Sequence, residues 1–205
     1  MDYQTPQEEF WAGQFGSEYV ARNRDPNLLG PKIRTFSQIL RLTRDVESVF
    51  EVGANIGLNM LAIRSILPAV ELNAIEINKD AYTALSGVIG DGATHGSILD
   101  FDATREFDFV FSCGVLIHIH PESLPLVYDK MYAMARRYIL VNEYYNPAPV
   151  EISYRGQAGR LFKRDFCGDL MDRFSDLELV DYGFTYRRDP VFPQDDCTWF
   201  LMRKR

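Results

Sequence analysis

The chain has 205 residues, of which 46% are hydrophobic and 25% are charged, as in an ordinary soluble globular domain. Its net charge of −7 argues against nucleic acid or an anionic membrane as the main partner, and no apolar run reaches the roughly 20 residues that span a bilayer. The acidic N-terminus is unlike a secretory signal and the three cysteines form no C-x-x-C pair, so we expect a cytoplasmic protein with reduced thiols and a small-molecule substrate. No feature of the sequence indicates an oligomeric state.

The predicted elements start with helices and continue as alternating strands and helices. Residues 1–45 are expected to form a helical cap, and residues 46–205 a single Rossmann-like domain. Strands are expected, in chain order, at Val49–Glu51, Glu71–Ile75, Ala93–Gly96, Phe107–Ser112, Tyr138–Val141, Glu178–Tyr186 and Thr198–Arg203. Helices are expected at Leu58–Leu67, Asn78–Val88, Pro121–Ala135 and Lys163–Phe174, and an irregular stretch at Glu143–Gly159. This alternation indicates a three-layer α/β sandwich around a mostly parallel seven-stranded sheet, in which the last two strands require one antiparallel strand because no helix separates them.

The first strand runs into a glycine-containing loop in the segment VFEVGANIGLN, Val49–Asn59. The strand ends in Glu51, and the loop carries Gly53, Asn55 and Gly57. A strand, a glycine turn and a helix in this order let the backbone approach a nucleotide-like ligand closely. The spacing differs from the G-x-G-x-x-G of a dinucleotide site, and the loop has no Lys or Arg to hold phosphate charge. We therefore expect these four residues to contact S-adenosylmethionine rather than a dinucleotide, with Asn55 tolerating left-handed backbone geometry where a glycine is common.

Two later strand ends complete the expected cofactor site. The second strand ends in Glu76, 23 residues after Gly53, where a carboxylate can accept both ribose hydroxyls; a solvated carboxylate is the alternative. Ile77 follows it directly. Ser97 and Ile98 follow the third strand, where they could offer a hydroxyl and an apolar face to the adenine, although an ordinary turn would need no ligand.

Aromatic residues recur at helical spacing near the N-terminus. Trp11, Phe15 and Tyr19 would lie on one face of a helix, which is typical of core packing. Their alternative use is as a lid over a sulfonium, because aromatic faces attract cations by roughly 1–2 kcal/mol. Arg22, one turn after Tyr19, could pair with the methionyl carboxylate.

The fourth strand leads into a segment with Cys113, His118 and His120 at the rim where ligands bind in open α/β sheets. His118 could orient a substrate or take a proton, or it could simply cap a turn. The two histidines lack further ligands at suitable spacing, so we expect no metal site.

The fifth strand delivers Asn142, Glu143, Tyr144 and Tyr145 to the same rim, where they are expected to line the acceptor side of the pocket. Asn142 and Tyr145 join His118 as candidate catalytic residues, and Tyr144 as a candidate substrate contact.

Basic residues then gather in an otherwise acidic chain: Arg155, Arg160, Lys163 and Arg164. The last two are expected to open a helix, where cations oppose the macrodipole. A solvated helix start is one interpretation. The other is that Arg155, Lys163 and Arg164 bind a carboxylate or phosphate of the substrate.

Three blocks of the sequence carry a family resemblance that extends over essentially the whole chain and is most specific in its C-terminal third. They are TPQEEFWAGQFGSEYVARN, VLIHIHPESLP and YYNPAPVEISYRG…LFKRDF…DYGF…RDPVFPQDDCTWFL. These blocks resemble the pseudaminic acid biosynthesis-associated methylase family, whose members are class I S-adenosylmethionine-dependent methyltransferases. The resemblance implies their Rossmann-like sandwich and their methyl donor. Asn142 departs from the family, which tends to have a small residue there.

Three functions are compatible with these features. The first is methyl transfer to an oxygen or nitrogen of a small anionic metabolite, with His118, Asn142 and Tyr145 placing the nucleophile in line with the methyl carbon. The second is intramolecular: the aminobutyrate part of S-adenosylmethionine closes to azetidine-2-carboxylate and methylthioadenosine leaves, with Asn142 orienting the α-amino group. The third is a non-catalytic module that binds S-adenosylmethionine. We favour methyl transfer.

Overall fold

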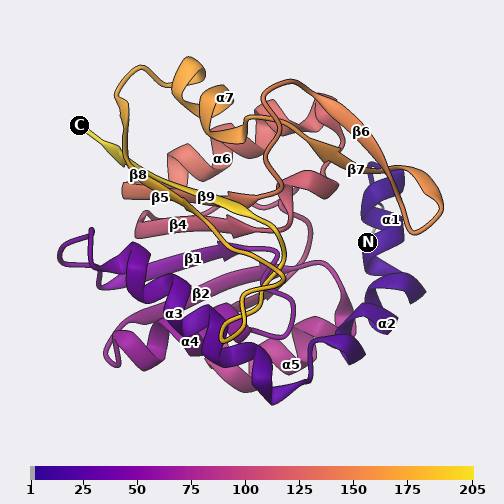
Figure 1. The fold of residues 1–205 in the computed structure, drawn as a ribbon, viewed down its shortest axis with the longest axis horizontal. Helices are drawn as coiled ribbons and strands as arrows, with labels where there is room; N and C mark the ends of the chain where they lie inside the picture. Colours follow the sequence, from indigo (N-terminus) through magenta and orange to yellow (C-terminus); the bar gives the residue numbers. More distant parts are fainter. Residues whose placement is uncertain (1–2) are drawn as a thin grey trace.

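The computed structural model describes residues 3–205, which build a sandwich around a central sheet (Figure 1). The sheet has seven strands in the order β3-β2-β1-β4-β5-β9-β8. Their bounds are β1 (Ser48–Val52), β2 (Glu71–Glu76), β3 (Ala93–His95), β4 (Phe107–Cys113), β5 (Ala135–Glu143), β8 (Leu177–Phe184) and β9 (Thr198–Lys204). β9 runs antiparallel to both β5 and β8, and the other neighbouring strands are parallel. The prediction of a mostly parallel sheet with one antiparallel strand is confirmed.

Helices cover both faces of the sheet and give it two hydrophobic cores (Figure 1). On one face lie α3 (Leu29–Leu40), α4 (Leu58–Ile66) and α5 (Lys79–Ile89), and on the other α6 (Leu124–Met134) and α7 (Phe166–Arg173). The sequence of β4 explains this arrangement, because Phe109 and Phe111 are buried in the first core and Val110 in the second. A strand that is apolar on both sides requires cover on both sides. Within residues 3–205, no helix is long and apolar enough to cross a bilayer.

The first two helices, α1 (Pro6–Ala12) and α2 (Gln14–Arg22), stand apart from these layers (Figure 1). They fold tightly on each other, since a Cβ on Gly16 would lie only 1.8 Å from the carbonyl oxygen of Trp11. Ser17 donates a 2.6 Å hydrogen bond to Asp80 and so joins α2 to the start of α5. The covering part of the N-terminal segment is therefore α1 and α2, whereas α3 belongs to a helical layer of the sandwich.

The segment after β5 differs from the prediction of an irregular stretch followed by a helix from Lys163. It forms a hairpin of β6 (Val150–Tyr154) and β7 (Gln157–Lys163), and α7 begins only at Phe166. The hairpin turns at Arg155 and Gly156, which both have positive φ, of 51° and 80°. The prediction was wrong because the glycines of this segment were interpreted as loop signals, whereas Gly156 serves a tight turn between two strands and Gly159 lies within β7.

Candidate functional site

A cavity of about 190 Å³ lies between the two N-terminal helices and the carboxyl ends of β1, β2 and β4. Most of the predicted cofactor contacts line it: Trp11, Tyr19, Gly53, Asn55, Glu76, Ile77, Ser97, Ile98, Cys113 and also His118. Residues that sequence reasoning did not single out complete the wall, among them Glu8, Lys32, Asn59, Asn78 and Ile119. The predicted ligand-binding edge of the sheet is thus a hollow that α1 and α2 cover.

The glycine loop contains three residues with left-handed backbone geometry. Gly53, Asn55 and Gly57 all have positive φ, of 70°, 50° and 84°. Gly53 also permits a close approach, because a Cβ there would lie 2.6 Å from a methyl group of Val115. Gly57 caps α4 and, unlike Gly53 and Asn55, does not line the cavity. The positive φ of Asn55 confirms the expectation that this asparagine adopts left-handed backbone geometry.

Glu76 fastens this loop to the end of β2. The carboxylate accepts the backbone N–H of Asn55 at 2.7 Å and that of Asn78 at 2.8 Å, one on each oxygen. Burial raises the pKa of Glu76, while these backbone hydrogen bonds lower it. A carboxylate has about four acceptor positions. Glu76 therefore keeps acceptor capacity for hydroxyl groups on the cavity side.

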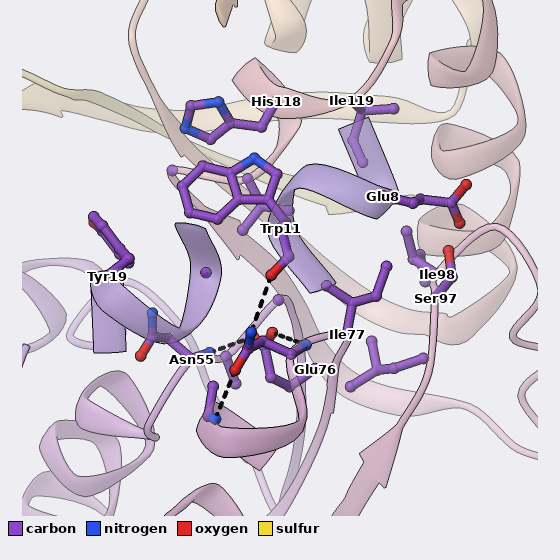
Figure 2. A pocket seen from close by; sticks show the side chains of 18 of the residues that line it. Glu8, Trp11, Tyr19, Asn55, Glu76, Ile77, Ser97, Ile98, His118 and Ile119 are labelled. Atoms are coloured by element: carbon purple, nitrogen blue, oxygen red, sulfur yellow. Dashed lines mark hydrogen bonds between the residues drawn. The ribbon is translucent and has the colours of Figure 1, made fainter. Parts of the chain in front are cut away.

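Aromatic rings form the outer wall of the cavity (Figure 2). The Trp11 indole lies 5.4 Å from the ring of Tyr19, 5.4 Å from that of Phe15 and 4.5 Å from the His118 imidazole, measured between centroids. Tyr154 of the hairpin lies 5.1 Å from His118. Trp11, Tyr19 and His118 line the cavity, whereas Tyr154 packs against one of the two hydrophobic cores. The expected single aromatic helix face was wrong, because Trp11 belongs to α1 and Phe15 and Tyr19 belong to α2.

His118 has a defined protonation state. Its Nδ1 lies 2.6 Å from the carbonyl oxygen of Arg160 in β7, and because a carbonyl can only accept, Nδ1 carries the hydrogen. Burial lowers the pKa of His118 to about 4, against a smaller opposing effect of that hydrogen bond. At neutral pH the imidazole is neutral, so Nε2 has a free lone pair.

The loop that carries His118 is held from below by Glu143 at the end of β5. The Glu143 carboxylate accepts the hydroxyl of Ser112 at 2.7 Å and the backbone N–H groups of Val115 and Leu116, both at 3.1 Å. Burial raises its pKa to about 7, although these hydrogen bonds favour the charged form. This buried carboxylate supports the short helical turn Leu116–His118 and does not line the cavity, where the sequence had placed it on the acceptor side.

A chain of polar side chains reaches the cavity wall from β1, which β2 separates from β3 and the following Ser97. Lys32 of α3 donates to Asn59 at 2.8 Å, and Asn59 donates to Glu51 at 2.5 Å. Glu51 is fully buried, which raises its pKa to about 8, and it lies behind the cavity wall rather than in it. Arg22 is exposed beside the Phe15 ring, 5.8 Å from its centroid, and does not line the cavity. The cation that reaches the cavity from the N-terminal segment is therefore Lys32.

The residues after β5 lie beside the cavity rather than in its wall. Asn142 pairs with the cavity-lining Cys113 across β4 and β5, and its buried Oδ1 has no hydrogen-bond partner in the described part of the chain. Tyr144 is half-buried, and burial raises its pKa, with a smaller contribution from Asp195. Tyr145 is 41% exposed and packs near Phe200, away from the cavity.

The predicted basic cluster is dispersed. Arg164 forms an ion pair with Asp169 at 2.7 Å, and Arg155 is exposed at the tip of the hairpin. The Lys163 ammonium lies 5.1 Å from the centroid of the Tyr144 ring. Neither Lys163 nor Arg164 opens a helix, because Asp165 is the N-cap of α7, so the argument from the helix dipole was wrong. Among residues 3–205, no three His, Cys, Asp or Glu side chains are grouped as a metal site would require.

Comparison with known proteins identifies the fold. No protein-family model matches the chain, so the predicted membership of the pseudaminic acid-associated family is not confirmed, and no curated protein matches it either. Among solved structures, the chain is similar to 1,6-didemethyltoxoflavin-N1-methyltransferase of Burkholderia thailandensis, with a TM-score of 0.69 and 14% identity over 100% of this chain and 92% of that one.

Two further solved structures are similar over nearly their whole length. One is magnesium protoporphyrin IX methyltransferase of Synechocystis PCC 6803, with a TM-score of 0.66 and 10% identity over 100% of both chains. The other is an amino pentose methyltransferase of Micromonospora echinaspora, with a TM-score of 0.63 and 11% identity over 93% of this chain and 96% of that one. The chain therefore has the class I methyltransferase fold.

Proposed function

We propose that the protein binds S-adenosylmethionine in this cavity and transfers its methyl group to an oxygen or nitrogen of a small molecule. The observation that carries the proposal is Glu76: a buried carboxylate that fastens the glycine loop and keeps acceptor capacity toward the cavity. A nucleoside with two ribose hydroxyls fits that acceptor, and the similar structures with bound S-adenosylmethionine or S-adenosylhomocysteine support the choice of ligand.

The residues around the cavity fit the remaining parts of that ligand. The apolar side chains of Ile77 and Ile98 suit the faces of a purine, and Lys32 suits a carboxylate at the other end. The faces of Trp11 and Tyr19 would attract a sulfonium. When bound, S-adenosylmethionine supplies an electrophilic methyl carbon.

His118 is placed to assist the transfer. Its neutral imidazole has a free lone pair on Nε2, which can orient an acceptor N–H or O–H and take its proton. The hairpin carbonyl of Arg160 fixes the ring so that this nitrogen, rather than Nδ1, is available. The main task of the site is to hold the nucleophile in line with the methyl carbon and sulfur, and a rigid imidazole serves that purpose.

Fewer basic residues than the sequence suggested are free to bind an anionic methyl acceptor. Arg164 is engaged by Asp169, whereas Lys163 remains beside Tyr144. We propose that an acceptor carboxylate or phosphate would lie near Lys163, next to the tyrosines that follow β5.

A second candidate reaction is supported by Asn142, whose buried Oδ1 has no partner within residues 3–205 and which pairs with Cys113 of the cavity wall. Such an acceptor could hold the α-amino group of S-adenosylmethionine toward Cγ. The amino nitrogen would form a bond to Cγ, the bond from Cγ to sulfur would break, and the nitrogen would lose a proton. The products would be azetidine-2-carboxylate and methylthioadenosine.

Incubation with S-adenosylmethionine alone separates these reactions. A methyltransferase should release almost no product without an acceptor, whereas the cyclising enzyme should accumulate methylthioadenosine and a C4 amino acid above the spontaneous background. Asn142→Ala should abolish that cyclisation, because the reaction depends steeply on the direction of attack. Turnover without an acceptor would refute methyl transfer. Failure to bind S-adenosylhomocysteine in calorimetry would refute the cofactor itself, and binding without turnover on any acceptor would favour a non-catalytic module.

A further inference from the structure

Glu8 of α1 points one unused oxygen into the cavity region. Its Oε2 accepts the backbone N–H groups of Gln4 and Thr5, both at 2.8 Å, and the Thr5 hydroxyl at 3.1 Å, which completes the cap of the helix. Its Oε1 is buried and has no hydrogen-bond partner in residues 3–205. The whole residue is only 5% exposed. A buried, half-satisfied carboxylate is costly in a folded protein, so a missing partner is to be expected.

Glu8 lies beside Ser97 and Ile98 in the cavity wall. Glu8, Ser97 and Ile98 all line the cavity, and Figure 2 shows them on the same side of the Trp11 indole. A hydrogen bond between the side chains of Gln4 and Asp100 joins the start of α1 to the loop that follows Ser97. The cap and the loop after β3 therefore close this end of the cavity together.

Ser97 offers the opposite polarity to Glu8. Its hydroxyl oxygen accepts the backbone N–H of Leu99 at 3.0 Å, so its hydrogen is free to be donated. The wall thus presents one acceptor, one donor and the apolar side chain of Ile98. The edge of adenine has the complementary pattern, since N1 accepts and the 6-amino group donates. A purine with a carbonyl at C6 and a hydrogen on N1 has the reversed pattern.

We propose that Glu8 and Ser97 recognise the adenine edge of S-adenosylmethionine, with Glu8 Oε1 accepting the 6-amino group and the Ser97 hydroxyl donating to N1. The inference rests on the proposed function and extends it to a residue of the cap. Glu8 belongs to α1, so the bound base would supply the partner that Glu8 lacks and would at the same time hold the cap against the cavity.

The test compares two ligands by calorimetry, S-adenosylhomocysteine and its deaminated analogue S-inosylhomocysteine. The unmodified protein should prefer the adenosyl ligand by about tenfold or more, because the inosyl ligand would leave the Glu8 carboxylate facing a carbonyl. In Glu8→Gln the amide oxygen would take the place of Oε2, where it still accepts the three hydrogen bonds that cap the helix. The amide N–H would then take the place of Oε1 and face the base. The preference should then fall at least severalfold or reverse. Glu9→Gln is the matched control, because Glu9 is the exposed neighbour in the same helical turn.

The ratio of the two affinities within one variant is the decisive quantity. A variant that merely loosens α1 would weaken both ligands alike and leave the ratio unchanged. Equal affinities in the unmodified protein, or an unaltered ratio in Glu8→Gln, would overturn the role of Glu8 and leave the cofactor site intact. Binding of neither ligand by the unmodified protein would overturn the proposed function instead.

Discussion

Replacement of Glu76 by alanine tests the cofactor site at its centre. The change removes the acceptor of two backbone N–H groups, Asn55 at 2.7 Å and Asn78 at 2.8 Å, together with the acceptors proposed for the ribose. Hydrogen bonds to a charged group are each worth about 1.5–3 kcal/mol. We expect the affinity for S-adenosylhomocysteine to fall about tenfold or more, and the free energy of unfolding to fall by about 2–3 kcal/mol because the glycine loop loses its anchor.

The two effects are measured separately, affinity by calorimetry at a temperature where the variant is folded and stability by urea unfolding without ligand. Glu71→Ala is the matched control, since it removes a glutamate at the start of the same strand whose side chain is 54% exposed. That control should change stability by no more than about 0.5 kcal/mol and leave affinity unaltered.

Unchanged affinity would refute the reasoning, even if stability fell. That result would mean that Glu76 only braces the loop, and the ligand assignment, which depends on its free acceptor positions, would lose its main support.

Three further predictions concern the lid, a buried carboxylate and the histidine. Trp11→Ala should clearly weaken ligand binding while it lowers the melting temperature of the ligand-free protein only slightly. Trp199→Ala, which removes a buried side chain from a hydrophobic core, should instead cost about 3–5 kcal/mol of stability. A large loss of stability of the ligand-free Trp11→Ala protein would mean that Trp11 has a packing role. Burial raises the pKa of Glu51 from 4.5 to about 8 in the folded protein, so the free energy of unfolding falls as the pH rises between these two values. Measured by urea unfolding, Glu51→Gln should therefore gain about 1–3 kcal/mol of stability relative to the unmodified protein between pH 5 and pH 8. A difference that does not depend on pH would contradict this. His118, with its pKa lowered to about 4, should keep turnover free of any histidine titration between pH 5 and pH 8, and a loss of rate with an apparent pKa near 6.5 that His118→Asn abolishes would show that the ring is not held neutral.

The residues that the sequence correctly placed together at the edge of the sheet are brought there by local sequence and strand pairing. A strand, a glycine turn and a helix follow one another within the segment Val49–Asn59, and the acid at the end of the next strand is brought alongside by parallel pairing. Asn55 and Glu76 meet for that reason. The prediction that Trp11 and Tyr19 share one helix face was wrong, because the helix breaks at Gly13 and places Trp11 in α1 and Tyr19 in α2. The tight packing of α1 on α2 still brings the two rings together beside the cavity.

The parts that were missed depend on how distant segments pack. Arg22 and Lys32 are both cations of the N-terminal segment, and nothing in their spacing shows which one turns toward the sheet. Lys32 does so because α3 packs against α4 and brings it to Asn59. Glu8 resembles any glutamate of a capping box, since the sequence does not reveal that its second oxygen is buried.

The misinterpreted segment after β5 has the largest consequence for the chemistry. The carbonyl of Arg160 fixes the tautomer of His118, and that carbonyl is in place because β7 is a strand rather than a loop. Gly159, next to it, accepts the Gln7 amide at 2.8 Å, so the same strand also holds α1. The hairpin therefore contacts both the candidate base and the cap, through two neighbouring carbonyl groups of β7. Residues that lie far apart in the sequence, Gln7 and His118, thus depend on the same strand for their position, and this is why a loop prediction for the segment could not reveal the orientation of the imidazole.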